Sequence, residues 1–254
     1  SRLIISRNYD TSEIYGINNS QKIINIFKDD KDFDKASLIL ISAINNNENI
    51  CILGDYDVDG SAATSLIVNF LKKLRHPFFY YIPDRIKDGY GASKKIFKKL
   101  ILKKPKLIIM VDCGSTSFDA INYLNQNNIK SLIIDHHEIY KPYPKANMII
   151  NPKKNNGYSE YDYLCATSLT YFFLDILIKK INCKINIKEY LIYVLLATVC
   201  DVMPLRKLNR LIAKKVINEF KITENKVFKK LYEINDKKNK ISIDDLAYLI
   251  GPIL

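Results

Sequence analysis

The stretch ICILGDYDVDGS, residues 50–61, places a short apolar run directly before three aspartates, Asp55, Asp57 and Asp59, and a Gly-Ser pair. A continuous apolar run of this length is typical of a strand that is buried on both faces of a parallel sheet. Apolar residues at helical spacing follow in residues 62–74 and predict a helix. The stretch therefore predicts a strand, an acidic turn and a helix, which is the first unit of an α/β fold.

The same alternation of apolar runs and amphipathic segments continues as far as residue 150. Strands are predicted at Ile50–Leu53, Phe78–Ile82, Leu107–Val111, Leu132–Ile134 and Met148–Ile150. Helices are predicted at about residues 35–45, 62–74, 93–102 and 118–127, where apolar residues recur at three- and four-residue spacing. Alternating strands and helices are typical of the α/β class. We therefore expect a mostly parallel five-stranded sheet flanked by helices.

After Asn151 the pattern changes to helices. They are predicted at about residues 163–179, 187–200, 209–220, 226–234 and 243–250. A polar stretch at residues 153–161 is the expected connection. The long apolar helices around Leu169 and Leu195 predict a helical segment that packs on the sheet. We therefore divide the chain into an α/β core, residues 1–152, and a helical part of the same lobe, residues 153–254.

The composition excludes several classes of protein. The chain has 254 residues, 48% of them hydrophobic, and lacks the apolar run of about 20 residues that spans a membrane. Charged residues interrupt residues 1–14, which therefore do not resemble a secretory signal. The five cysteines include no C-x-x-C pair, so we expect reduced thiols and no structural zinc. A soluble, cytoplasmic protein with no membrane partner is the expectation.

The charge of the chain suits a polyanionic partner such as nucleic acid. Lysine and arginine number 39 against 27 aspartates and glutamates, which gives a net charge of +12. Because lysine greatly outnumbers arginine, the codon bias of an AT-rich genome would give the same balance. Lys94, Lys95, Lys98 and Lys99 lie on one predicted helix and could contact phosphates. A solvated helix face is the favoured interpretation of them.

Acidic residues and histidines fall where the predicted strands end. Asp55 and Asp57 follow the first strand, Asp112 follows the third, and Asp135, His136 and His137 follow the fourth. The carboxyl ends of parallel strands lie on one edge of a sheet, where ligands bind beside a reversal of strand order. Aspartates brought together repel one another unless a cation neutralises them. Carboxylates with imidazole suit Mn²⁺ or Mg²⁺, and two such ions would support phosphoester hydrolysis.

The three aspartates of the first turn could serve purposes besides metal binding. Asp-x-Asp-x-Asp-Gly also opens an EF-hand calcium loop, but the position that requires glutamate holds Leu66. For Asp59 we favour a role as N-cap of the following helix over a role as metal ligand, because a carboxylate accepts the unpaired N–H groups of a helix start.

The remaining candidates could also occur for simpler reasons. A pair such as His136-His137 is often accidental, although its place directly after Asp135 at a strand end argues against that here. Asp201 follows an apolar helix and precedes Pro204, so by itself it could be a turn residue.

Four motifs in this order resemble those of the DHH phosphoesterases. They are GDYDVDG at residues 54–60, VDCGS at residues 111–115, DHH at residues 135–137 and ATVCDVMPL at residues 197–205. YIPDRIKDGYG, residues 81–91, is similar to a segment that marks the RecJ branch of the family, which comprises single-strand DNA exonucleases. Asn151-Pro152 also matches that branch. The resemblance covers nearly the whole chain.

The resemblance implies specific roles for the site residues. One Mn²⁺ or Mg²⁺ would be bound by Asp57, Asp112, His136 and Asp201, and a second by Asp55 and a bridging Asp112. Arg85, His137 and Ser115 would bind the substrate, and His137 would contact or position the scissile phosphate. Asp59 and Asp135 would cap a helix or support the ligands.

The resemblance also implies an activity. It implies metal-dependent hydrolysis of phosphodiesters that releases 5′ mononucleotides from single-stranded DNA in the 5′ to 3′ direction, in DNA repair and recombination. Single-stranded DNA is then the partner, with other repair proteins as further candidates. One alternative is a phosphoesterase of the same family that cleaves oligoribonucleotides, cyclic dinucleotides or nucleotide bisphosphates. Another is a catalytically weak scaffold that binds DNA or replication proteins.

The sequence departs from the family pattern in three places. Leu53 stands where some members carry a histidine of the second metal site, and Cys113 replaces a usual asparagine. Residues 165–168, Cys-Ala-Thr-Ser, replace a glycine-rich turn, and bulkier residues there would narrow the site. The sequence ends at Leu254, before the DHH-associated and oligonucleotide-binding domains of full-length relatives. We therefore expect it to correspond to the N-terminal catalytic lobe.

Overall fold

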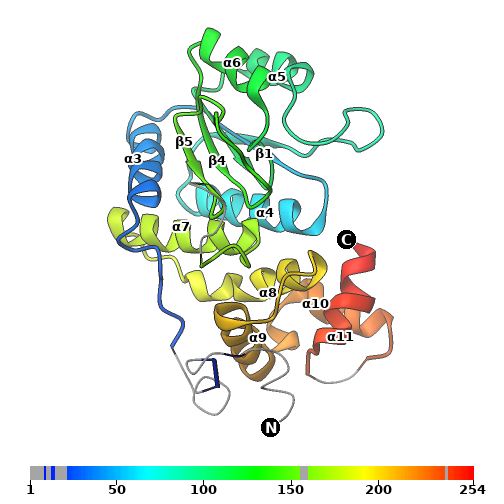
Figure 1. Cartoon of the computed structure of the whole chain (residues 1–254). Coiled ribbons are helices and arrows are strands. Elements are labelled where there is room, and N and C mark those ends of the chain that lie inside the picture. The colour runs from blue at the N-terminus through cyan, green and yellow to red at the C-terminus, as the bar shows by residue number, and fades with distance from the viewer. Residues whose placement is uncertain (1–8, 10–12, 15–21, 155–159, 238–239) are drawn as a thin grey trace.

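The computed structural model of the protein describes residues 9, 13–14, 22–154, 160–237 and 240–254. In this part of the chain, five parallel strands form one sheet with the order β2-β1-β3-β4-β5 (Figure 1). The strands are β1 Ile50–Gly54, β2 Phe78–Tyr81, β3 Leu107–Val111, β4 Lys130–Ile134 and β5 Met148–Ile150. The predicted α/β fold with a mostly parallel five-stranded sheet is confirmed.

The strands end in register at the carboxyl edge of the sheet. Gly54 pairs with Val111, Val111 with Ile134, and Ile134 with Ile150. β1 lies between β2 and β3, so the order of the strands reverses between β1 and β3. The residues that directly follow these strand ends therefore border a crevice of the kind in which open α/β sheets bind ligands.

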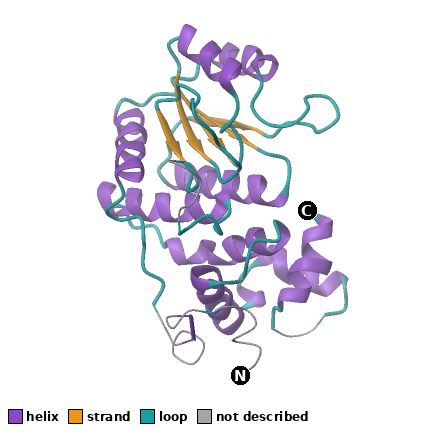
Figure 2. Ribbon diagram, viewed as in Figure 1, coloured by secondary structure: helices purple, strands orange, loops and turns teal. Residues whose placement is uncertain are grey.

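Helices cover both faces of the sheet (Figure 2). α5 (Lys94–Leu100) and α6 (Phe118–Gln126) cover one face, and α3 (Lys31–Asn45), α4 (Val58–Lys73) and α7 (Ala166–Ile181) cover the other. Successive side chains of a strand point to opposite faces, so each strand contributes to two cores. In β1, Ile50 and Ile52 pack in the core of α4, whereas Cys51 and Leu53 pack in the core of α5. Because both of their faces are buried, β1 and β3 are continuously apolar in sequence.

The chain after α7 forms a helical layer that packs against α4 and α7. Its elements are η2 Ile187–Tyr190, α8 Leu191–Cys200, α9 Lys207–Glu219, η3 Ile222–Glu224, α10 Lys226–Ile234, α11 Ile243–Asp245, η4 Leu246–Ile250 and η5 Gly251–Ile253. α8 lies between α7 and α9 (Figure 1). It is almost wholly buried and contributes to the same core as α4 and α7. No helix in the described ranges is long and apolar enough to cross a membrane. All five cysteines are free thiols.

Several helix boundaries differ from the predicted ones. α4 begins at Val58, before the predicted start at residue 62, because Asp57 caps it. The prediction missed this turn because residues 59–61 are not apolar. The predicted helix at residues 187–200 is the 3₁₀ turn η2 followed by α8. Residues 155–159 of the predicted connection lie outside the described residues.

Candidate metal centre at the carboxyl edge of the sheet

Four polar residues occupy equivalent positions at the carboxyl edge of the sheet. Asp55 follows β1, Asp112 follows β3, Asp135 follows β4 and Asn151 follows β5. Because the preceding strand residues pair with one another, these four residues form a row. The three aspartates are each at most 2% exposed. Carboxylates buried to this extent require hydrogen bonds or a cation.

The turn between β1 and α4 holds Asp55 and Asp57. Burial raises the pKa of Asp55 above its ordinary value, and the nearby charge of Asp57 adds to the effect. Asp57 is exposed and caps α4, because its Oδ1 atom accepts a hydrogen bond from Gly60 N at 2.8 Å. Glycine is required at position 60, since a β carbon there would lie 2.6 Å from backbone atoms of Asp55. The turn is thus tight enough to bring both carboxylates to the sheet edge.

The structure corrects the capping role predicted for Asp59. The N-cap of α4 is Asp57, and Asp59 lies inside the first turn of that helix. Its carboxylate accepts hydrogen bonds from Ala166 N (2.7 Å) and Thr167 N (2.8 Å), the first two residues of α7. Asp59 therefore caps a helix that begins 107 residues later in the chain. Its Oδ2 atom also lies 3.6 Å from Nε2 of His136, so the same carboxylate faces the site.

Asp112 is the most enclosed carboxylate of the site. Its φ angle is 59°, in the left-handed region that aspartate tolerates better than most residues. Both of its carboxylate oxygens are buried and have no hydrogen-bond partner among the described residues. Burial, followed by the charges of Asp59 and Asp57, raises the pKa of Asp112 far above its ordinary value. As an anion this carboxylate is stable only beside a positive charge.

His136 brings Asp112 and Asp201 together. Its Nε2 atom lies 3.2 Å from Oδ1 of Asp112 and 3.4 Å from Oδ2 of Asp201. The ring is buried, and in the described part of the chain neither of its nitrogens has a hydrogen-bond partner. A buried polar group without a partner is costly, and a bound ion would remove that cost. Imidazole beside carboxylates is a ligand set that suits Mn²⁺.

Asp201 reaches this cluster from the helical part of the chain. It is the C-cap of α8, and its backbone N–H donates to Ala197 O at 2.9 Å. The next residue, Val202, has a φ of 54°, which is unusual for a β-branched residue and turns the chain sharply beside the site. Burial raises the pKa of Asp201, although the imidazole of His136 acts in the opposite direction.

A hydrogen-bond network around Asp135 supports the cluster. Asp135 accepts hydrogen bonds from the backbone N–H groups of Ser115 (3.0 Å), His136 (2.8 Å) and His137 (3.2 Å). Nδ1 of His137 lies 2.8 Å from Oδ1 of the same carboxylate. Although burial acts to raise it, these hydrogen bonds lower the pKa of Asp135 to about 2. The same contact is the main cause that raises the pKa of His137. Asp135 therefore orients the ring of His137 and fixes the backbone of His136.

Asn151 and Ser115 lie behind the carboxylates. The Nδ2 atom of Asn151 donates to Ser115 Oγ (2.8 Å) and to the backbone oxygen of His137 (2.9 Å). Ser115 is 2% exposed, so its hydroxyl is enclosed in this network. Asn151 belongs to the family resemblance but not to the predicted site, because the sequence does not show that β5 ends in register with β4.

Arg85 and Tyr90 are exposed and lie at the rim of the site. The guanidinium of Arg85 lies over the ring of Tyr56, 5.3 Å from its centre. The hydroxyl of Tyr90 is 3.2 Å from Nε2 of His137. Tyr90 is not among the predicted site residues, although it belongs to the segment at residues 81–91 that carries the RecJ resemblance. That segment is the signal that could have identified it.

Three overlapping groups of side chains in the described part of the chain have ligand atoms close enough to hold a metal ion. They are Asp55-Asp57-Asp112, Asp59-His136-Asp201 and Asp112-His136-His137, and within each group the ligand atoms lie within 4.8 Å of one another. The third group shares Asp112 with the first and His136 with the second, so the three groups form one cluster. A cation would satisfy the buried oxygens of Asp112 and the ring nitrogens of His136. The residues present therefore fit one or two divalent ions.

Known proteins resemble this chain in sequence. The model of the DHH family, N-terminal domain, matches residues 49–198. The single-stranded-DNA-specific exonuclease RecJ of Bacillus subtilis is 28% identical over 235 residues, which cover 92% of this chain and 29% of that protein. RecJ of Haemophilus influenzae is 28% identical over 232 residues, which cover 87% of this chain and 40% of that protein. The chain thus spans less than half the length of these relatives.

Solved structures share the fold. The crystal structure of exonuclease RecJ bound to manganese has a TM-score of 0.77 at 24% identity and matches over 87% of this chain and 56% of that chain. The structure of RecJ from Thermus thermophilus in complex with Mn²⁺ has a TM-score of 0.72 at 22% identity, over 87% of this chain and 32% of that one.

Proposed function

Because the chain belongs to the DHH family, we propose that it is a divalent-metal-dependent phosphoesterase that cleaves single-stranded DNA from its 5′ end. The observation that carries this proposal is the cluster of Asp112 and His136. Two buried side chains from different strand ends face each other with their polar atoms unpartnered among the described residues, as metal ligands do before the ion binds. These oxygens and ring nitrogens lie together beside the other acids of the site, so that bound cations would satisfy them jointly.

Mn²⁺ or Mg²⁺ is the proposed cofactor. By the family resemblance, Asp57, Asp112, His136 and Asp201 would hold one ion, and Asp55 with Asp112 would hold a second. In the structure, ligand atoms of Asp55, Asp57 and Asp112 lie together, as do those of Asp59, His136 and Asp201. Asp59 is a further candidate ligand, because it lies in one group with His136 and Asp201. When bound, the ions polarise the phosphoryl oxygens and lower the pKa of water at the site.

The protein's own groups would orient the substrate. Asp135 holds Nδ1 of His137, so Nε2 of that ring is directed toward Tyr90 at the exposed side of the site. The raised pKa of His137 favours its protonated form, which donates a hydrogen bond to a phosphate oxygen from Nε2. Arg85, exposed on the rim, would bind a second phosphate group of the strand.

The proposed substrate rests on the relatives. Proteins named single-stranded-DNA-specific exonuclease match 87–92% of this chain. Their names support single-stranded DNA as the partner. Hydrolysis in the 5′ to 3′ direction and a role in DNA repair and recombination in the cytoplasm are further parts of the proposal, which the family resemblance implies. The chain spans only 29–40% of the length of these two relatives. That it has the activity of the full-length proteins is therefore a proposal.

The activity can be tested with labelled oligonucleotides. We expect the chain to shorten single-stranded DNA in the presence of Mn²⁺, and a label at the 5′ end to be released before a label at the 3′ end. Asp57→Ala and His136→Ala should abolish this shortening, whereas Asp244→Ala, which removes an exposed carboxylate on α11, should retain it. Full activity in both site variants would refute the proposal.

A phosphoesterase of short substrates is the second candidate function. Residues 165–168, Cys-Ala-Thr-Ser, are buried beside Asp59, and their side chains would narrow the site more than glycines would. A narrow site favours dinucleotides or nucleotide bisphosphates over long strands. Comparing kcat/KM for a dinucleotide with that for a long single strand distinguishes the two candidates.

A further inference from the structure

A dense concentration of positive charge lies on α5 and the residues that follow it. Residues 94–106 read KKIFKKLILKKPK and contain seven lysines and no acidic residue. In the whole chain, 39 of 254 residues are basic and 27 are acidic. The segment therefore far exceeds the background of lysine that codon bias would give the chain as a whole. We call these seven lysines the α5 lysine face.

The α5 lysine face is exposed along its whole length. Ile96, Phe97 and Leu100 are buried against the sheet, whereas all seven lysines are exposed. The face continues from α5 through η1 (Ile101–Lys103) to Lys104 and Lys106. In Figure 1, α5 and α6 form the outer layer on this side of the sheet, away from α8 to α11.

Neighbouring acids neutralise little of this charge. Lys99 pairs with Asp88 at 2.9 Å, and the Nζ atom of Lys95 donates to the backbone oxygen of Lys87 at 2.9 Å. These two contacts hold the segment that carries Arg85 and Tyr90 against α5. Among the described residues, Lys98, Lys104 and Lys106 form no ion pair, and the same is true of Lys94 and Lys103, which lie over aromatic rings.

The lysine face begins beside the candidate metal centre and leads away from it. Ser93 and Lys94 at the start of α5 line a hollow of about 440 Å³ with Thr116 and Ser117, which follow Ser115 directly. At the other end of the face, Asn49 Nδ2 donates to Lys103 O at 2.9 Å, next to the start of β1. The face thus runs from the carboxyl edge of the sheet to its opposite edge.

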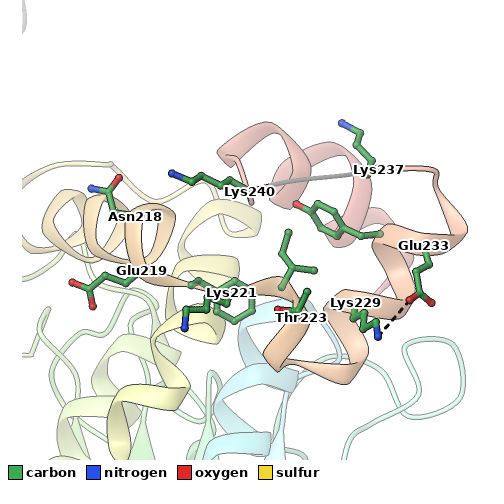
Figure 3. A pocket seen from close by; sticks show the side chains of 11 residues that line it. Asn218, Glu219, Lys221, Thr223, Lys229, Glu233, Lys237 and Lys240 are labelled. Carbon is green, nitrogen blue, oxygen red and sulfur yellow. Dashed lines mark ion pairs between the residues drawn. The ribbon is translucent and has the colours of Figure 1, made fainter.

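A second lysine-rich surface of the molecule differs from the α5 lysine face in its charge balance. A hollow of about 850 Å³ between α9, η3 and α10 also contains lysines (Figure 3). Lys229 is paired with Glu233 there, as the dashed line shows, and Lys221 is paired with Glu224. Its charges are largely balanced by neighbouring acids, so it lacks the electrostatic attraction of the α5 lysine face.

We propose that the α5 lysine face binds the sugar-phosphate backbone of the nucleic-acid strand whose end lies in the metal centre. This proposal rests on the proposed function for the identity of the strand. Lysines bind phosphates as point charges without reading sequence, which suits an enzyme that must accept any base. Their exposed row would hold the remainder of the strand while its end is hydrolysed.

The test compares two triple variants that lose the same charge. Lys98→Ala/Lys104→Ala/Lys106→Ala removes three unpaired lysines of the face, and Lys31→Ala/Lys35→Ala/Lys226→Ala removes three exposed lysines on α3 and α10. Binding of a fluorescent single-stranded oligonucleotide is measured in EDTA at several salt concentrations. The association constant K falls as salt rises, and the magnitude of the slope of log K against log salt should be about 2 smaller for the first variant. Three lysines are removed, and each phosphate contact on a single strand contributes roughly 0.7 to that slope. It should change by much less for the second variant.

Two outcomes would overturn the role of the α5 lysine face, and a third would contradict the proposed function instead. If both variants lost the same affinity for the oligonucleotide, the loss would be a general effect of net charge. This result would overturn the proposal that the α5 lysine face binds the strand. Binding to vesicles of anionic phospholipid, with none to the oligonucleotide, would also overturn it. Hydrolysis of bis(p-nitrophenyl) phosphate with Mn²⁺ should be the same in the wild type and in both variants. No hydrolysis by the wild type would contradict the proposed function, while the binding result in EDTA would stand by itself.

Discussion

The Nε2 atom of His136 lies 3.2 Å from Oδ1 of Asp112, although the two residues follow different strands of the sheet. Both side chains are buried, and within the described residues none of their polar side-chain atoms has a hydrogen-bond partner. An arrangement of this kind is unfavourable in the protein alone and favourable once a cation is bound. The same relationship therefore predicts how stability depends on pH and on metal.

Without metal, the stability of the protein should fall as pH rises above about 4, where an unfolded carboxyl loses its proton. The raised pKa of Asp112 means that the folded protein keeps this proton while the unfolded chain releases it. Each such carboxyl can lower the free energy of unfolding by up to about 1.4 kcal/mol per pH unit. Asp112→Asn should give a flatter dependence in urea denaturation between pH 5 and pH 8 in EDTA. The same slope in both proteins would contradict this account.

Asp135 should have the opposite effect on stability. Its pKa is lowered to about 2, so its contribution is present above pH 4 and is lost as pH falls through 2. Asp135→Asn should reduce the free energy of unfolding by about 2 kcal/mol at pH 7, because several N–H donors lose a charged acceptor. Urea denaturation of the variant and of Asp119→Asn, an exposed control, measures the effect. A loss no larger than that of the control would disprove the role of Asp135.

Asp59→Ala should destabilise the protein through a distant helix. The substitution leaves the N–H groups of Ala166 and Thr167 without their acceptors in a buried place, at a cost of about 2 kcal/mol. Asp30→Ala, which removes the exposed N-cap of α3, is the matched control and should cost about 1 kcal/mol. Thermal unfolding in EDTA distinguishes the two. If Asp59→Ala costs less than Asp30→Ala, the carboxylate does not hold α7.

Arg85→Ala should weaken substrate binding more than turnover. The guanidinium lies at the exposed rim, apart from the ligand groups, so its loss removes binding that the ground state and the transition state share. We expect KM for single-stranded DNA to rise about tenfold, equivalent to about 1.4 kcal/mol, with kcat little changed. Arg85→Lys keeps the charge but not the planar guanidinium, so its KM should lie between those of the wild type and Arg85→Ala. A large fall in kcat at unchanged KM would contradict a binding role.

β1 and β3 could be predicted from the sequence because they are buried on both faces and are therefore continuously apolar. β3 and β5 begin and end where their apolar runs do, at Leu107–Val111 and Met148–Ile150. Helix starts were less predictable, because they depend on caps. α4 begins at Val58, because the carboxylate of Asp57 accepts a hydrogen bond from the N–H of Gly60. The residues that follow Val58, Asp59 to Ser61, have no apolar period that would predict a helix.

The acids at strand ends could be predicted because topology alone brings them together. Asp55, Asp112 and Asp135 follow strands that pair in register, so no side-chain detail was needed to place them on one edge. The contact of Asp59 with α7 was not predictable, since it joins residues 107 positions apart through tertiary packing. Local sequence shows a carboxylate near a helix start, but it does not show which helix the carboxylate caps.

Calorimetric titration with Mn²⁺ tests the central claim most directly, because it measures the proposed ion without any assumption about substrate. The wild type should bind one or two ions, and Asp112→Asn should lose this binding because both proposed ions share that carboxylate. Asp119→Asn, which removes a similar charge outside the cluster, should bind as the wild type does. If Asp112→Asn binds Mn²⁺ with the stoichiometry and affinity of the wild type, the carboxyl edge of the sheet is not the metal centre.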